Sequence, residues 1–223
     1  MDFVLSVWRE ACRHIDIDES IERIARLLPS RLPADALIVR AFNVTEHRIN
    51  TVAVGLTRGG PPIVPRHREV TAEQMNGLLA WCRRGELAHG TPESRDALLR
   101  LLVPIESGEW IVGPLRRDTE PIGALVLFAR PPHRFDDRHL PTAEALLEPI
   151  AIAVANDFHF HELARLREAV EAENRALRSR LERDSVDDAI VGADGGLRDF
   201  MERIDQVAPT DVPVLILGET GSG

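Results

Sequence analysis

Between residues 67 and 96 the sequence carries side chains that could ligate a metal or react with a substrate. They are two histidines, a cysteine and an aspartate: His67, Cys82, His89 and Asp96. Their spacing matches no known ligand pattern, and an intracellular metal site needs several converging ligands. Cys82 shares an apolar helical face with Met75 and Leu78, where an unpaired cysteine behaves as a small hydrophobe. These residue types therefore predict neither a metal site nor catalytic machinery.

A second candidate site is the glycine-rich segment that follows the apolar residues 212–217. It consists of Gly218, Glu219, Thr220, Gly221, Ser222 and Gly223. These residues supply the first two glycines of G-x-x-x-x-G-K-[ST], in which backbone N–H groups surround phosphates and the lysine neutralises them. The sequence stops before that lysine. We expect these residues to bind nucleotide phosphates only in a complete domain with ATP and magnesium, and we expect no ATP hydrolysis by this chain.

Composition narrows the class of protein. The chain has 223 residues, a formal charge of -9 and 4% aromatic residues. An acidic chain is poorly suited to coat DNA or an anionic membrane, and so few aromatic rings argue against stacking on single-stranded nucleic acid. The two cysteines form no disulfide or zinc pattern, no signal peptide is apparent, and no apolar run is long enough to span a membrane. We expect a cytoplasmic protein without a membrane partner.

Periodicity and turn residues predict the first elements. Residues 2–33 have the pattern of two helices, the second capped by Asp18. Residues 35–42 and 49–56 look like strands and are separated by a polar turn. This arrangement predicts an antiparallel hairpin. Residues 57–68 contain two glycines and three prolines, and this composition predicts a loop.

Capping signals predict two helices in the next segment. Thr71 and Gln74 form a capping box, and Gly85 can end the helix that follows. A shorter helix is expected from Thr91, with Pro92 in its first turn.

A second hairpin is predicted from residues 110–116 and 121–128. The latter strand is apolar on both faces, so it should be central and the sheet should be covered on both sides. A helical region is expected to begin at Asp136 or Asp137, with a kink where Pro149 removes a backbone donor.

From residue 157 onward the chain becomes rich in Arg, Glu and Ala. Leu163, Val170 and Leu177 keep a seven-residue spacing. This spacing predicts a short, imperfect coiled coil or connecting helix, and hence a homodimer; the alternative is a lone solvated helix. A break is expected at 184–188, followed by a helix over 197–207 and a buried strand at 212–217.

Two resemblances give these patterns a context. Residues 190–223, including the run VAPTDVPVLILGETG at 207–221, closely resemble the entry to the AAA+ ATPase domain of sigma-54-dependent transcriptional activators. That resemblance implies that sigma-54 RNA polymerase and DNA are contacted only through parts absent from this chain. The runs IVGPL at 111–115, PIGALVL at 121–127 and RFDD at 134–137 resemble a GAF domain. A GAF domain has a mostly antiparallel sheet with helices on one face and, on the other, loops that can enclose a small effector.

In the GAF resemblance, His67, Cys82, His89 and Asp96 fall in the region that closes the ligand pocket, and we therefore retain them as candidate ligand-pocket residues. We expect an α+β chain with an N-terminal helix (1–16), a GAF sensor (17–158), a linker helix or coiled coil (159–188) and the start of an AAA+ domain (190–223). Its predicted function is non-enzymatic: it senses an unknown small molecule and controls the attached ATPase. Two alternatives remain, a GAF-fold thiol-based methionine sulfoxide reductase and a ligand-free dimerisation module.

Overall fold

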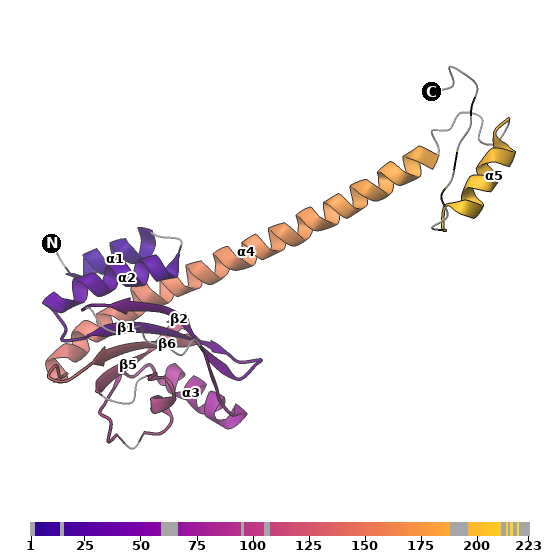
Figure 1. The fold of residues 1–223 in the computed structure, drawn as a ribbon. Helices are drawn as coiled ribbons and strands as arrows, with labels where there is room; N and C mark the ends of the chain where they lie inside the picture. The colour runs from indigo at the N-terminus through magenta and orange to yellow at the C-terminus, as the bar shows by residue number, and fades with distance from the viewer. Residues whose placement is uncertain are drawn as a thin grey trace. The chain divides into compact units, whose positions relative to one another are not determined.

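A six-stranded antiparallel sheet forms the centre of the protein (Figure 1). The computed structural model describes residues 3–13, 16–58, 67–94, 96–104, 108–187, 196–210, 213, 215 and 218. The strands lie in the order β3-β2-β1-β6-β5-β4. Their bounds are β1 Ala36–Asn43, β2 Arg48–Leu56, β3 His67–Glu69, β4 Ala88–Gly90, β5 Glu109–Arg117 and β6 Glu120–Ala129.

Both predicted hairpins are present, and β1 and β6 join them. β1 pairs with β2, β5 pairs with β6, and β1 also pairs with β6, with Ala36 opposite Phe128 and Ala41 opposite Gly123. Alternate residues of β6 enter different clusters of buried side chains, with Leu125 on one face and Val126 on the other. The prediction of a central strand that is buried on both faces is therefore confirmed.

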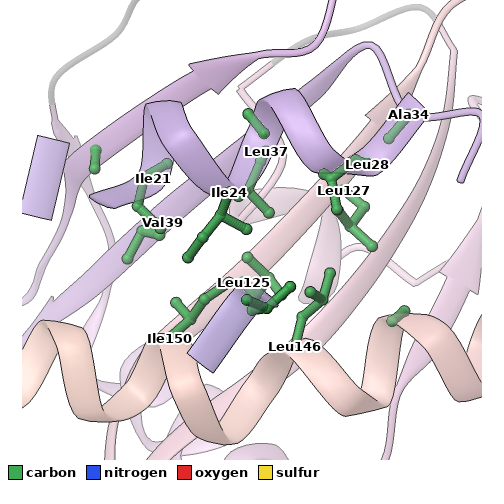
Figure 2. Close-up of a cluster of buried hydrophobic side chains, with 14 of the residues drawn as sticks. Ile21, Ile24, Leu28, Ala34, Leu37, Val39, Leu125, Leu127, Leu146 and Ile150 are labelled. Atoms are coloured by element: carbon green, nitrogen blue, oxygen red, sulfur yellow. The ribbon is translucent and has the colours of Figure 1, made fainter. Parts of the chain in front are cut away.

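One face of the sheet is covered by regular helices. These are α1 (Phe3–Arg13), α2 (Ile17–Leu27) with the short 3-10 turn η1 (Leu28–Ser30), and the first part of α4 (Leu140–Asp187). Figure 2 shows Ile21 and Ile24 of α2 and Ile150 of α4 directed toward the sheet, which buries all three completely. The N-cap of α2 is Asp16 and not the expected Asp18, because the Asp16 carboxylate accepts from the Asp18 N–H at 2.8 Å.

The opposite face is covered by α3 (Ala72–Arg84), the 3-10 turn η2 (Leu99–Leu101) and connecting segments. α3 begins with the predicted capping box of Thr71 and Gln74. It ends at Gly85, whose φ of 79° is the left-handed conformation that glycine tolerates.

Two expectations for the segments around this face were wrong. The helix expected from Thr91 is replaced by turns and η2, because the Asp96 carboxylate caps the N–H groups of Leu98 and Leu99 and Pro104 disfavours helical geometry at the residue before it. The expected loop over 57–68 ends early, since His67 and Arg68 belong to the short edge strand β3.

α4 is a single helix of 48 residues that contains Pro149 and continues through the predicted boundary at residue 158. Its beginning is buried, including Leu146 and Val154, whereas Leu163, Val170 and Leu177 are 66%, 56% and 50% exposed. The chain divides into two units, Met1–Ala164 and Arg165–Gly223. The predicted boundaries at residues 16, 158 and 188 stay predictions.

The second unit contains the remainder of α4 and the helix α5 (Arg198–Val207). α5 agrees with the helix predicted over 197–207. Most of the strand expected at 212–217, and the glycine-rich segment except Gly218, lie outside the described residues. In the part of the chain that is described, no helix is long and apolar enough to cross a membrane.

The contact between α2 and β2 depends on Gly55. A Cβ atom on Gly55 would lie 2.5 Å from the Ala25 Cβ and 2.6 Å from the Ile21 carbonyl oxygen. We therefore expect Gly55→Ala to push α2 away from the sheet and to lower the free energy of unfolding by about 1–3 kcal/mol. Urea unfolding followed by circular dichroism measures this change. Gly196→Ala is the control, because its Cβ would meet nothing within 4 Å; equal destabilisation by both variants would contradict the packing argument.

Candidate functional site

The four residues selected from the sequence do not converge on one point. His67 lies in β3 and His89 in β4, which are opposite edges of the sheet. Asp96 caps η2, and Cys82 lies in α3. Among the described residues no group of three His, Cys, Asp or Glu side chains could hold a metal. A role for these four residues in effector binding stays a prediction.

Cys82 is a core residue. Its side chain is completely buried, and its sulfur lies 3.5 Å from the carbonyl oxygens of Leu115 and Gly123, to which the thiol can donate. Burial raises the pKa of the Cys82 thiol to about 11, because the apolar surroundings disfavour the charged thiolate. The side chain therefore fills the space between α3 and the sheet, as its apolar helical face predicted.

His89 belongs to a polar cluster around Glu109, at the start of β5. The Glu109 carboxylate accepts from the Phe135 N–H at 2.8 Å and lies 3.6 Å from His89 Nε2. Phe135 also packs edge-on against the His89 ring. These contacts attach the segment before α4 to the edge of the sheet, so the geometry supports a structural role for His89.

A second polar cluster surrounds Asp35, which the sequence did not single out. Its carboxylate accepts from the Arg130 N–H at 2.7 Å and from His133 Nδ1 at 3.1 Å, and it lies 3.9 Å from an Arg58 Nη1. Its backbone bonds to Phe128 and Thr57. Asp35 therefore holds the ends of β2 and β6 beside the start of β1. Its role is structural.

A small cavity lies on the α3 side of the sheet, next to the chain neighbours of His67 and Asp96. Its volume is about 140 Å³, and it is lined by charged, aromatic and aliphatic residues: Arg68, Pro92, Ala97, Arg100, Leu101, Val103, Gly108 and Trp110. The two arginines come from β3 and η2, and Trp110 comes from β5. The cavity therefore has two cationic groups and an apolar wall, a combination that can orient a small polar ligand.

Arg40 brings a third guanidinium to the same side of the sheet. It lies in β1 two residues after Ile38, which packs in the α3-side cluster, and it is only 1% exposed. Its Nη1 donates to Thr51 Oγ1 at 2.5 Å. Burial, followed by the nearby charge of Arg68, lowers the pKa of Arg40 to about 10. Arg40 is therefore protonated at neutral pH and places a positive charge inside this layer.

Two larger hollows lie elsewhere on the first unit. One, of about 430 Å³, lies between α4 residues such as Leu147 and Ile152 and the arginines of the β5–β6 turn. The other, of about 520 Å³, lies at the β1–β2 turn beside Phe158. Neither contains a residue selected from the sequence, although the first also places two arginines beside apolar side chains of α4.

The sequence contained one signal for this cationic layer. Arg40 interrupts the run Leu37-Ile38-Val39-Arg40-Ala41, where a charge inside an otherwise apolar strand is unusual. Arg68 and Arg100 had no comparable signal, because arginines are scattered along the whole chain and the edge strand β3 is too short to show periodicity.

Comparison with curated proteins identifies transcriptional activators. The chain is 25% identical to the formate hydrogenlyase transcriptional activator of Salmonella typhimurium (strain SL1344), over 99% of this chain and 32% of the relative. It is 34% identical to the formate hydrogenlyase transcriptional activator FhlA of Escherichia coli (strain K12), over 55% of this chain and 16% of the relative. The chain thus spans about a third of the first relative's length. No family model matches it.

Solved structures identify the fold of the first unit. The phycoerythrobilin-bound GAF domain of a cyanobacterial phytochrome matches 71% of this chain and 97% of its own length, with a TM-score of 0.53 and 13% identity. The domain has the GAF fold. The free methionine-R-sulfoxide reductase of Neisseria meningitidis matches 70% of this chain and 89% of its own length, with a TM-score of 0.51 and 13% identity. At these identities the similarity concerns the fold alone.

Together the two comparisons confirm the predicted combination. The relatives are activators of the family recognised in the sequence, and the neighbouring structures are GAF domains. The chain is thus similar in sequence to transcriptional activators and in fold to GAF domains. The AAA+ segment is not established by these matches.

The burial of Cys82 generates a test of the thiol-reductase alternative. At pH 8 a thiol with a pKa of about 11 is only roughly one part in a thousand thiolate, which is the reactive form. We expect iodoacetamide to modify the exposed Cys12 in the native protein and to modify Cys82 only after denaturation, as measured by peptide mass spectrometry. Cys12→Ser is the control and should abolish native labelling. Rapid native labelling of Cys82 would instead indicate a reactive, accessible thiol.

Proposed function

We propose that this chain is the small-molecule-sensing part of a sigma-54-dependent transcriptional activator and that it controls an attached AAA+ ATPase. The observation that carries the proposal is the combination of a GAF fold with similarity to one activator along almost the whole chain. GAF neighbours with bound chromophores support a sensing role, because their bilins occupy the same fold. DNA and sigma-54 RNA polymerase are contacted by other parts of the activator, in the cytoplasm.

The effector binds on the α3 side of the sheet in this proposal. That side has the less regular covering, with η2 and connecting segments, and it contains the cavity next to Trp110. On the helical side, α1, α2 and the buried part of α4 pack against the sheet through apolar side chains, and the hollow beside Leu147 and Ile152 lies only at the end of β5. The sheet then separates the effector from α4.

We propose that α4 links the sensor to the ATPase and also forms a homodimer. Leu163, Leu166, Val170 and Leu177 expose 49–66% of their surface in the single chain. A helix with so narrow an apolar strip gains little stability alone but gains more when the strip pairs with a second copy. A dimer of this helix would bring together two copies of the segment that follows α4. Such pairing would favour assembly of an oligomeric ATPase.

A thiol-based reductase is the less favoured function. The similarity to the methionine sulfoxide reductase is at 13% identity and concerns the fold alone. A reductase of this kind needs a reactive cysteine and a resolving partner, whereas Cys82 is buried with a raised pKa and Cys12 lies in α1, on the other side of the sheet. Assays for reductant-dependent turnover of methionine sulfoxide should therefore give the protein-free rate.

A thermal-shift screen tests the sensing function directly. A compound that binds only the native state raises its stability by about 2.7 kcal/mol at one hundred times its Kd. We expect at least one compound among metals, cyclic nucleotides and small metabolites to raise the melting temperature in a saturable way. If no compound in the screen raises it, the passive dimerisation module becomes the better description of this domain.

Substitution in the apolar strip tests the dimer. Val170→Glu places two carboxylates opposite each other in the seam, and we expect the dimer dissociation constant to rise about tenfold or more, measured by analytical ultracentrifugation. Ala172→Glu is the matched control, because it makes the same change in charge two residues away, about 200° around the helix. Equal weakening by both variants would indicate general charge repulsion rather than a seam at Val170.

A further inference from the structure

Guanidinium groups from three separate elements lie on one side of the sheet. Arg40 comes from β1, Arg68 from β3 and Arg100 from η2. Arg68 pairs across strands with Ile49, which packs in the α3-side cluster, and cross-strand partners share a face of the sheet. Arg40 pairs in the same way with Thr51, two residues along β2 from Ile49. Three cations thus meet in the layer that covers this face.

The hydrogen bonds of the two cavity arginines hold their side chains in place. Arg68 donates through Nη1 to the carbonyl oxygens of Arg100 and Leu101, at 3.1 and 3.2 Å. Arg100 donates to the carbonyl oxygen of Pro92. These bonds use a minority of the five N–H groups of each guanidinium. The acceptors are neutral carbonyls, so the bonds orient both cations without cancelling their charge.

The described lining of this cavity contains no carboxylate. Within the described part of the chain, no carboxylate forms an ion pair with Arg68 or Arg100, although other arginines such as Arg23, Arg48 and Arg138 do form such pairs. The positive charge of Arg100 acts on Glu93, whose pKa is lowered first by a hydrogen bond from Thr91 and also by Arg100. Asp96 is engaged with the N–H groups of η2. Among the described residues that line the cavity, the charged side chains are therefore the two arginines.

Size limits the ligand that this charge can attract. The cavity of about 140 Å³ is close to the engineered cavity of about 150 Å³ that binds benzene. A nucleotide is too large for it. Trp110, Leu101 and Val103 line the same cavity as the arginines, a combination that suits a compact molecule with one charged end and a small apolar part.

From this arrangement we propose that the effector of the domain is a compact oxyanion, a small carboxylate or phosphate, held between Arg68 and Arg100 with its remaining atoms against Trp110. Planar guanidinium groups bind carboxylate and phosphate oxygens through paired N–H donors. The charge of Arg68 also acts on Arg40, which is buried in the same layer. This inference rests on the proposed function, because it names the chemical class of the molecule that the domain senses.

Isothermal titration calorimetry of the whole chain tests the proposal with three probes at constant ionic strength. Sodium acetate and inorganic phosphate represent the two sources of the oxyanion, and acetamide is the neutral analogue of acetate. We expect saturable binding of acetate or phosphate and none of acetamide. Arg68→Gln and Arg100→Gln should each weaken that binding at least about tenfold. Arg31→Gln, which removes an exposed arginine outside the cavity lining, should leave it unchanged.

Loss of either arginine could also weaken binding indirectly, by loosening η2. A further variant, which keeps both arginines, separates these two effects. Ala97→Leu adds bulk at the cavity lining and preserves both guanidiniums. It should weaken anion binding by a similar factor, while the melting temperature without ligand stays within a few degrees of wild type. Anion binding that survives in all three cavity variants would overturn the proposal, since the ion would then bind elsewhere on the surface.

The remaining outcomes separate this inference from the proposed function. If neither anion binds but a neutral metabolite raises the melting temperature in the screen, the domain is a sensor and the oxyanion class is wrong. If neither anion binds and no compound of any charge does, both proposals fail. Binding of acetate without phosphate assigns a carboxylate effector, and binding of phosphate without acetate assigns a phosphorylated one; either result supports the site.

Discussion

Burial of both faces of β1, β6 and β5 is the constraint on which the first unit depends. Val39 and Leu125 belong to one cluster of buried side chains, whereas Ile38 and Val126 belong to the other. Each strand therefore needs two separate coverings, and neither hairpin can be stable without them. The amphipathic helices α1 and α2, the buried part of α4 and the helix α3 all exist as coverings for this sheet.

The two coverings meet this requirement differently. The helical layer of α1, α2 and α4 is built from apolar side chains that pack against one another and the sheet, and Asp157 and Ser20 are the few polar residues buried near it. The α3 layer combines one capped helix with a 3-10 turn and contains a buried arginine. Burying a guanidinium costs free energy that an apolar residue in β1 would not cost. Departures from the best packing are concentrated at functional sites. The buried charge of Arg40 is such a departure, and it lies in the α3 layer.

Much of the fold could be predicted from the sequence, because local signals and burial agreed. The Thr71–Gln74 capping box, the end of α3 at Gly85 and the two hairpins each depend on residues close together in the chain. The failures occurred where distant contacts decide. β3 and β4 are three-residue edge strands held by pairing with β2 and β5, and no periodicity can appear in so few residues. The helix expected from Thr91 failed because Asp96, five residues later, caps a shorter turn.

The candidate site was less predictable for the same reason. Histidine, cysteine and aspartate attract notice by their chemistry, yet Cys82 and His89 serve packing and a structural ion cluster. The cavity is formed by Arg68, Arg100 and Trp110, which come from β3, η2 and β5 and become neighbours only through the sheet order. Of this set, only the associated Arg40 could have been noticed, as a charge within an apolar strand.

The position of the cavity determines how a bound molecule could act on the rest of the chain. Trp110 faces the cavity, and the next residue of β5, Ile111, faces the helical layer that includes Leu146 and Ile150 of α4. A shift of β5 or its partner β6 is therefore one way in which a ligand on one face can reach α4, because a densely packed sheet transmits such a shift rather than absorbing it. α4 has no break before Asp187, so a change in how its first turns pack is carried along the helix that bears the exposed apolar strip.

Coupling also requires that α4 have two packing arrangements of similar free energy. Pro149, which removes one backbone hydrogen bond beside the fully buried Ile150, is the position where the helix can change direction at the lowest cost.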